Sequence, residues 1–110
     1  MKTKLTGLDR LNIPLILNKA IPEGGGLEVI TIKEIIDMVG IPSEEFEEYG
    51  LKQNPQGGIM WNNEKIKLEK EFDLKKPHTE ILKKAADVLD QQKKVNLQIV
   101  DTWAKIKEMR

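Results

Sequence analysis

The chain contains no cysteine, which excludes disulfides, thiolate metal sites, iron–sulfur clusters and cysteine nucleophiles. That composition fits a reducing compartment. Histidine is almost absent as well, since His78 is the only one. A histidine-ligated metal site needs several histidines or suitably spaced carboxylates, so we expect no metal and no cofactor.

Long apolar runs are also missing. The longest, near Ile13–Leu17 and Val29–Ile36, are short or interrupted by polar residues. A membrane-spanning helix needs roughly 20 apolar residues, so we expect no membrane association. Lys2 and Lys4 are not followed by the apolar stretch of a signal peptide, and we expect a cytoplasmic protein.

Neither sign of charge is in excess, because 18 basic residues balance 18 acidic ones. Dedicated nucleic-acid binders usually carry a basic surplus, so nucleic acid is a disfavoured partner. The charges are nevertheless unevenly placed: between Glu23 and Gly50 there are eight acidic residues and one base, Lys33. Such polarity can steer a partner, although a solvated acidic helix face explains it equally simply.

The first half of the chain predicts helices. Thr6 is a good N-cap, with Asp9 favourable in the first turn, and Pro14 should end or bend this helix. A second apolar period should form a helix that starts at the capping-box pattern Thr31–Glu34 or runs from about Glu28, and that stops at Gly40.

A short acidic helix should follow, with Ser43 as its N-cap and Gly50 as its stop. Phe46 and Tyr49 lie three residues apart on one face. The opposite face should present four glutamates to water, and these four are Glu44, Glu45, Glu47 and Glu48.

The pattern then changes to that of strands. Ile59 and Trp61 flank Met60 after a turn at Asn54–Gly58, and apolar residues alternate with charged ones over Ile66–Leu74. A small antiparallel hairpin or three-stranded meander should result.

Two more helices are expected at the C-terminal end, from Pro77 to about Gln91 and from Asn96 onward. We expect them to form an antiparallel helical hairpin across Gln91–Val95.

These elements predict a single α+β domain over residues 1–110, mostly helical, with four to five helices and a small β hairpin or meander. Residues 5–74 would hold the first helices and the hairpin, and residues 75–110 the C-terminal helices. The order of elements over 5–74 resembles a winged helix-turn-helix. Four glutamates on its second helix oppose phosphate contacts, and that helix has no Arg, Lys, Asn or Gln to read bases.

Candidate reactive groups each have a simpler interpretation. His78 begins a helix, where an exposed or capping role is expected. Glu44 and Glu48 are spaced to share a hard cation but lack the loop of a calcium site. Trp61 and Trp103 suit an interface, but in a chain with five aromatic residues we expect them to anchor the core.

Several short segments carry a resemblance, and they are Leu8-Asp9-Arg10-Leu11, Ser43-x-Glu45, Ile59-Met60-Trp61-Asn62, Leu82-Lys83-Lys84, Leu89-Asp90 and Lys93-Lys94-Val95. On these segments the chain as a whole resembles a loose family of small uncharacterised proteins encoded by phages and prophages. The resemblance implies a viral or mobile-element origin and a bacterial cytosol, and it carries no known activity.

We therefore expect a non-enzymatic protein-interaction module, such as a phage-encoded modulator of a host protein. The alternatives are a winged-helix-like DNA-binding regulator using Lys65, Lys67 and Lys70, and a homo-oligomeric structural protein. The predicted partner-binding residues are Glu44, Glu45, Glu47, Glu48 and Tyr49.

Overall fold

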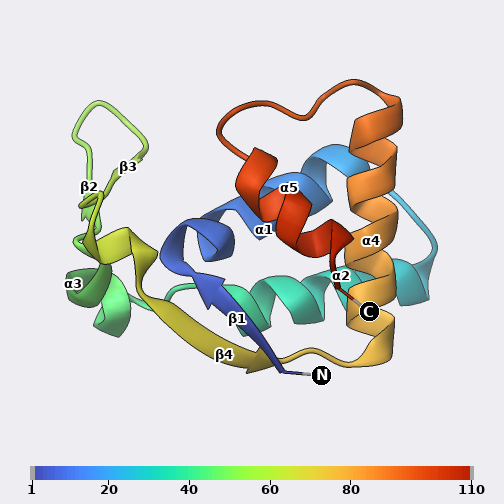
Figure 1. Ribbon diagram of the computed structural model, residues 1–110, viewed down its shortest axis with the longest axis horizontal. Coiled ribbons are helices and arrows are strands. Elements are labelled where there is room, and N and C mark those ends of the chain that lie inside the picture. The colour runs from blue at the N-terminus through green and yellow to red at the C-terminus, as the bar shows by residue number, and fades with distance from the viewer. Residues whose placement is uncertain (1, 110) are drawn as a thin grey trace.

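Residues 2–109 are described in the computed structural model, and they confirm an α+β architecture dominated by helices. Four longer helices pack together, while a one-turn helix and a small hairpin lie to one side (Figure 1). The elements are β1 Lys2–Thr6, α1 Gly7–Ala20, α2 Gly26–Val39, α3 Phe46–Tyr49, β2 Lys52–Gln53, β3 Ile59–Met60, β4 Glu69–Asp73, α4 Lys76–Gln91 and α5 Val100–Lys107, with 3₁₀ turns at Ser43–Glu45 (η1) and Lys65–Lys67 (η2).

The strands form two separate antiparallel sheets, β1 with β4 and β2 with β3. The expected hairpin is therefore present, but the strand within 66–74 pairs with β1, which the sequence did not predict as a strand. Lys2 faces Asp73 and Lys4 faces Glu71 on the exposed side. Facing opposite charges stabilise a strand pair, so they favour this register, which also turns Leu5 into the core.

Helix α1 begins where Thr6 was expected to cap it. The Thr6 hydroxyl accepts the Asp9 N–H at 3.1 Å, and the Asp9 carboxylate accepts the Thr6 N–H at 3.0 Å. Pro14 does not end the helix, which continues to Ala20. A proline removes one backbone hydrogen bond, and burial of the next turn, including Leu17, offsets that loss.

Helix α2 begins at Gly26, close to the earlier of its two expected starts, near Glu28. Thr31 lies inside it, and its hydroxyl donates to the Leu27 carbonyl at 2.9 Å instead of capping a helix end. The helix stops at Gly40 as expected, and the Gly40 N–H donates to the Ile36 carbonyl. An apolar period that continues upstream of a threonine thus outweighs a capping pattern.

The last two helices pack against each other and against α1. Helix α4 ends at Gln91 as predicted, but α5 begins only at Val100, because Asn96 caps a preceding turn by accepting the N–H groups of Gln98 and Ile99. The Trp103 indole N–H donates to a carbonyl of α4 at 3.0 Å, so Trp103 anchors the core as expected.

Two apolar clusters hold the fold. The main cluster lies among α1, α2, α4 and α5, and its completely buried side chains are Leu5, Ile13, Ile16, Leu17, Ile35, Val39, Leu74, Leu82, Ala85, Ala86, Leu89 and Ile106. The smaller one, formed by Tyr49, Leu51 and Ile66, lies between α3 and η2. Gly7 joins this cluster to α1, since its Cα faces the Tyr49 ring.

Gly7→Ala should destabilise the protein although alanine favours helices. The added Cβ would lie 2.5 Å from Tyr49 Cδ1 and 2.9 Å from Ile66 Cδ1, so one of them must shift. We expect a net loss of about 1–2 kcal/mol in the free energy of unfolding, measured with urea. Gly26→Ala, with no atom within 4 Å, is the matched control and should be neutral or slightly stabilising. Equal stability of Gly7→Ala and the wild type would contradict the close packing described.

Candidate functional site

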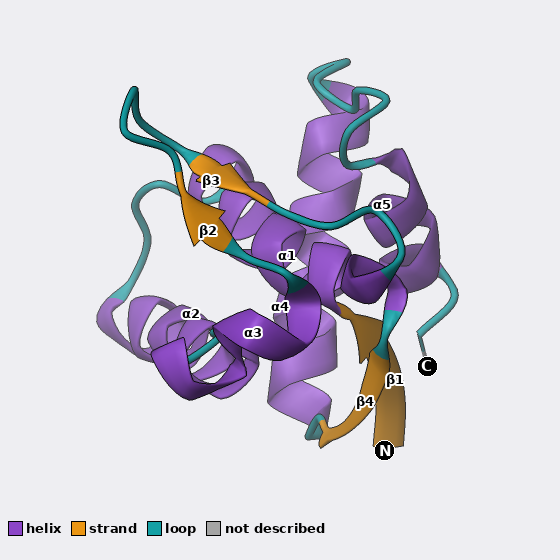
Figure 2. Ribbon diagram, turned by 90° about the vertical axis from the view of Figure 1, so that its left-hand side faces the viewer, coloured by secondary structure: helices purple, strands orange, loops and turns teal. Residues whose placement is uncertain are grey.

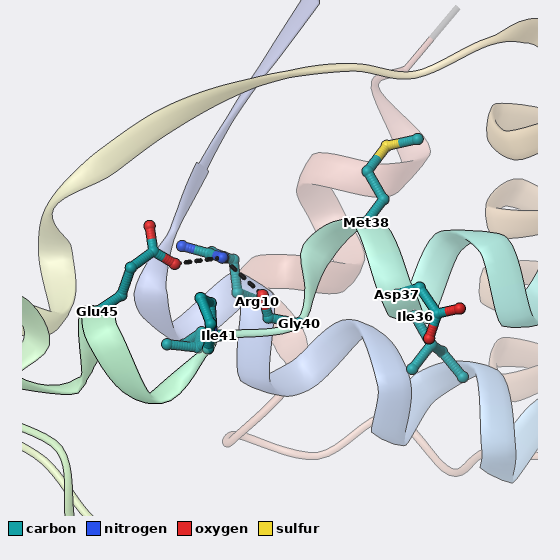
Figure 3. Close-up of a pocket in the computed structure, with 8 residues that line it drawn as sticks. Arg10, Ile36, Asp37, Met38, Gly40, Ile41 and Glu45 are labelled. Atoms are coloured by element: carbon teal, nitrogen blue, oxygen red, sulfur yellow. Dashed lines mark hydrogen bonds and ion pairs between the residues drawn. The ribbon is translucent and has the colours of Figure 1, made fainter.

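A buried arginine fixes the region in which the partner-binding residues were predicted. Arg10, on α1, is 4% exposed, and its Nε donates to the Val39 carbonyl at 2.8 Å and its Nη2 to the Gly40 carbonyl at 2.7 Å (Figure 3). Both carbonyls belong to the end of α2, where a cation also complements the helix dipole. Arg10 thereby ties α1 to the corner between α2 and η1.

The same guanidinium holds Glu45. Arg10 Nη2 lies 2.8 Å from Glu45 Oε2, and Lys70 of β4 binds the other carboxylate oxygen. Lys70 also lies 2.9 Å from a carboxylate oxygen of Glu48. Hydrogen bonds from Arg10 and then Lys70 outweigh partial desolvation and lower the pKa of Glu45 below its ordinary value.

Aromatic rings complete this cluster. The Arg10 guanidinium carbon lies 5.0 Å from the centre of the Phe72 ring and 5.6 Å from that of Tyr49. Arg10 Nη1 also donates to the Tyr49 hydroxyl at 3.0 Å. A planar guanidinium can serve rings and oxygens together, whereas a lysine ammonium cannot. We call Arg10, Glu45, Tyr49, Lys70 and Phe72 the arginine cluster.

The structure divides the predicted partner-binding residues. Glu44, Glu47 and Glu48 are exposed, while Glu45 is half-buried between its two cations. Tyr49 is completely buried. A side chain without exposed surface cannot contact a partner, so Tyr49 is not part of the predicted binding surface. Glu45 stabilises the fold through its two ion pairs.

The acidic helix is shorter than predicted. Ser43 is the first residue of η1, whose N-cap is Pro42. Helix α3 proper covers only Phe46–Tyr49, with Glu45 at its N-cap position, so Ser43 does not cap it. A shallow hollow of about 570 Å³ runs beside this corner (Figure 3). Arg10 lines it with donors already bonded to protein oxygens, so its role there is structural.

The corner between α2 and α3 does not develop into a winged helix-turn-helix. Helix α3 has four residues, and the β2–β3 hairpin forms its own sheet instead of joining β1 and β4. Lys70, one of three lysines expected to contact DNA, is held by Glu45 and Glu48. Residues 2–109 therefore do not contain a recognition helix with an adjoining wing.

His78 caps α4, which is one of the two roles expected for it. Its Nδ1 accepts the Lys75 N–H at 3.2 Å, which leaves Nε2 to donate to the Glu34 carboxylate at 3.3 Å. It is buried, not exposed. Among residues 2–109, no group of three or more histidine, aspartate or glutamate side chains is arranged to hold a metal ion.

The hairpin exposes three consecutive apolar side chains, and one of them, Trp61, was expected in the core. Ile59, Met60 and Trp61 are 44%, 53% and 36% exposed. Trp61 was expected in the core, but the strand before it is only two residues long and ends in a surface loop. Figure 2 shows β2 and β3 extending away from the helices, with α3 below them. The run of three apolar residues directly after two glycines was the available signal.

No protein-family model, no curated protein and no solved structure matches this chain. In the part of the chain that the structure describes, none of the helices combines the length and apolarity needed to cross a bilayer.

The arginine cluster predicts a defined response to acid. A carboxyl group whose pKa is lowered by folding stabilises the protein above its ordinary pKa, 4.5 for Glu45, and that stabilisation is lost as pH falls through the folded value. We expect the free energy of unfolding to fall between about pH 5 and about pH 3. In Glu45→Gln this decline should be smaller, with a loss of about 1 kcal/mol at neutral pH.

Glu44→Gln is the control, because Glu44 is exposed and forms no ion pair with any of residues 2–109. It should follow the wild-type curve in urea titrations across this pH range. An unchanged pH dependence in Glu45→Gln would show that the cluster does not depend on the ionised carboxylate.

Proposed function

We propose that this protein is a non-enzymatic protein-binding module whose contact surface is the β2–β3 hairpin together with the exposed glutamates of η1 and α3. The observation that carries the proposal is the exposure of three consecutive apolar side chains, Ile59, Met60 and Trp61, on one hairpin. Burying such side chains against a partner is favourable, and grouped exposed apolar residues mark interaction sites.

The hairpin is held in one conformation at both ends. At its tip, the Gly57 N–H donates to the Asn54 carbonyl at 2.9 Å, and both glycines of the turn have positive φ. At its base, Leu51 is buried and its N–H donates to the Phe46 carbonyl at 2.8 Å, while the Ile66 N–H donates to the Asn62 carbonyl. A preorganised surface loses less entropy on binding, which supports a role in recognition.

The glutamates add an electrostatic component. Glu44, Glu47 and Glu48 lie exposed on a helix that the arginine cluster holds in place, and that helix leads directly into the hairpin. Such charges raise the rate of encounter with a basic patch of a partner.

The resemblance over Leu8–Leu11 and Ile59–Asn62 extends this proposal to a biological setting. It supports a phage-encoded protein that acts in the bacterial cytoplasm by binding a host protein. The segment Ile59–Asn62 includes the exposed apolar residues, so the likeness and the proposed surface coincide there.

Replacing the hairpin side chains should abolish capture of the partner. Immobilised Ile59→Ser/Met60→Ser protein should lose about tenfold or more of the enrichment of specific bacterial proteins, quantified by mass spectrometry. Leu27→Ser/Leu97→Ser, at two leucines that are 84% and 93% exposed elsewhere, is the matched control and should retain it. Light scattering tells whether the partner is a second copy. Equal enrichment by both variants would refute the proposed surface.

Charge reversal should act on association kinetics. Against the captured partner, Glu44→Lys/Glu47→Lys should lower the association rate constant about tenfold at low salt, with a smaller effect at high salt. Glu48 is left intact because it binds Lys70. The control Glu80→Lys/Asp90→Lys changes net charge equally on exposed positions of α4. If both variants slow association to the same extent, the glutamates of η1 and α3 have no specific part in recognition.

A further inference from the structure

A cleft opens on the side of Trp61 that faces the start of α1 and the helix α5. It has a volume of about 470 Å³, within the range of pockets that hold small ligands or bulky side chains. Three stretches of the chain form it, residues 6–9, 61–67 and 101–105, and its lining includes Leu8, Asp9, Trp61, Ile66, Lys67 and Asp101.

The walls of this cleft are apolar. Leu8 and Ile66 belong to the small apolar cluster, and Trp61 forms the outer wall with about a third of its surface exposed. The indole ring of Trp61 offers a large, rigid surface to a second apolar group. Tryptophan is among the residues that contribute most binding energy in protein interfaces.

The polar floor is already satisfied. Asp9 Oδ1 accepts the Thr102 hydroxyl at 2.6 Å, and Oδ2 accepts the Thr6 N–H and an ammonium hydrogen of Lys105. Burial raises the pKa of Asp9, but these hydrogen bonds outweigh it and the pKa is lowered. The floor therefore requires no polar ligand, and an apolar group can enter without breaking an ion pair.

Unpaired lysines surround Trp61. Lys67 lies on the rim of the cleft, and a second hollow of about 300 Å³ on Trp61 is lined by Lys52 and Lys65. These three lysines are exposed and form no ion pair among residues 2–109. In the same described residues, Asp101 of the cleft and the exposed Glu64 beside Lys65 also have no bound cation, so the three lysines leave a small excess of positive charge near Trp61.

We propose that the cleft binds a bulky apolar side chain, aromatic by preference, carried by an acidic peptide segment of the partner. This inference rests on the proposed protein-binding function and names the partner's chemistry. The apolar walls take the side chain, and Lys52, Lys65 and Lys67 attract the flanking carboxylates.

A peptide fits these features better than a nucleic acid. A single-stranded nucleic acid binds across successive aromatic platforms in a basic groove, and this surface has one aromatic ring.

The test is an NMR titration of ¹⁵N-labelled protein with three acetylated, amidated tripeptides: Glu-Trp-Glu, Glu-Ala-Glu and Lys-Trp-Lys. Glu-Trp-Glu should shift the Trp61 indole resonance and the amides of Leu8 and Ile66, and should bind about tenfold more tightly than either of the others at low salt. Lys65→Glu/Lys67→Glu, a change confined to the surface, should reverse the preference between the two tryptophan peptides, and Leu97→Ala should leave it unchanged.

Equal affinity for Glu-Trp-Glu and Lys-Trp-Lys, shifts that avoid the cleft, or tighter binding of single-stranded oligothymidine would overturn the inference. So would failure of Trp61→Ala, with a well-dispersed spectrum, to weaken Glu-Trp-Glu. The peptide titration tests the cleft alone, because the proposed protein-binding function is tested separately by partner capture with variants at Ile59 and Met60. If no peptide binds but that capture difference persists, only the cleft is refuted.

Discussion

The burial of one guanidinium constrains most of this structure. Arg10 has almost no contact with water, so its donors must find oxygens inside the protein, and they find them in the end of α2, in Glu45 and in Tyr49. Removing a charge from water is costly, and several hydrogen bonds are needed to offset that cost. Once they form, α1, α2, α3 and β4 have fixed positions relative to one another.

That constraint explains how a helix of four residues holds a defined place. An isolated helix of this length has no stability of its own. Here Tyr49 is buried under the guanidinium, and Lys70 connects Glu45 and Glu48 to β4. The base of the hairpin follows directly, so the rigidity of the exposed apolar surface originates in a charge buried on α1.

Local signals in the sequence predicted a large part of the fold. The Thr6–Asp9 capping box, the stop at Gly40 and the amphipathic period of α4 depend on neighbours within one or two turns. Strand β1 had no such signal, because its alternation of lysines with Thr3 and Leu5 becomes meaningful only opposite the acidic face of β4. Likewise, the predicted acidic surface was visible as a run of glutamates, but the side chains of Glu45 and Tyr49 bind an arginine that lies 39 residues before the tyrosine. The cleft at Trp61 is built from three distant stretches, so it leaves no local signal in the sequence.

The pairing of β1 with β4 has a consequence for biosynthesis. Strand β1 is synthesised before its partner β4, which begins at Glu69. During that interval its backbone donors and acceptors have no β4 to bind, a situation in which nascent strands associate with other chains. Lys2 and Lys4 place positive charge along β1 before β4 is available, and charged side chains on an unpaired strand oppose its association with other chains. The two residues that set the register of the finished sheet therefore also protect β1 during synthesis.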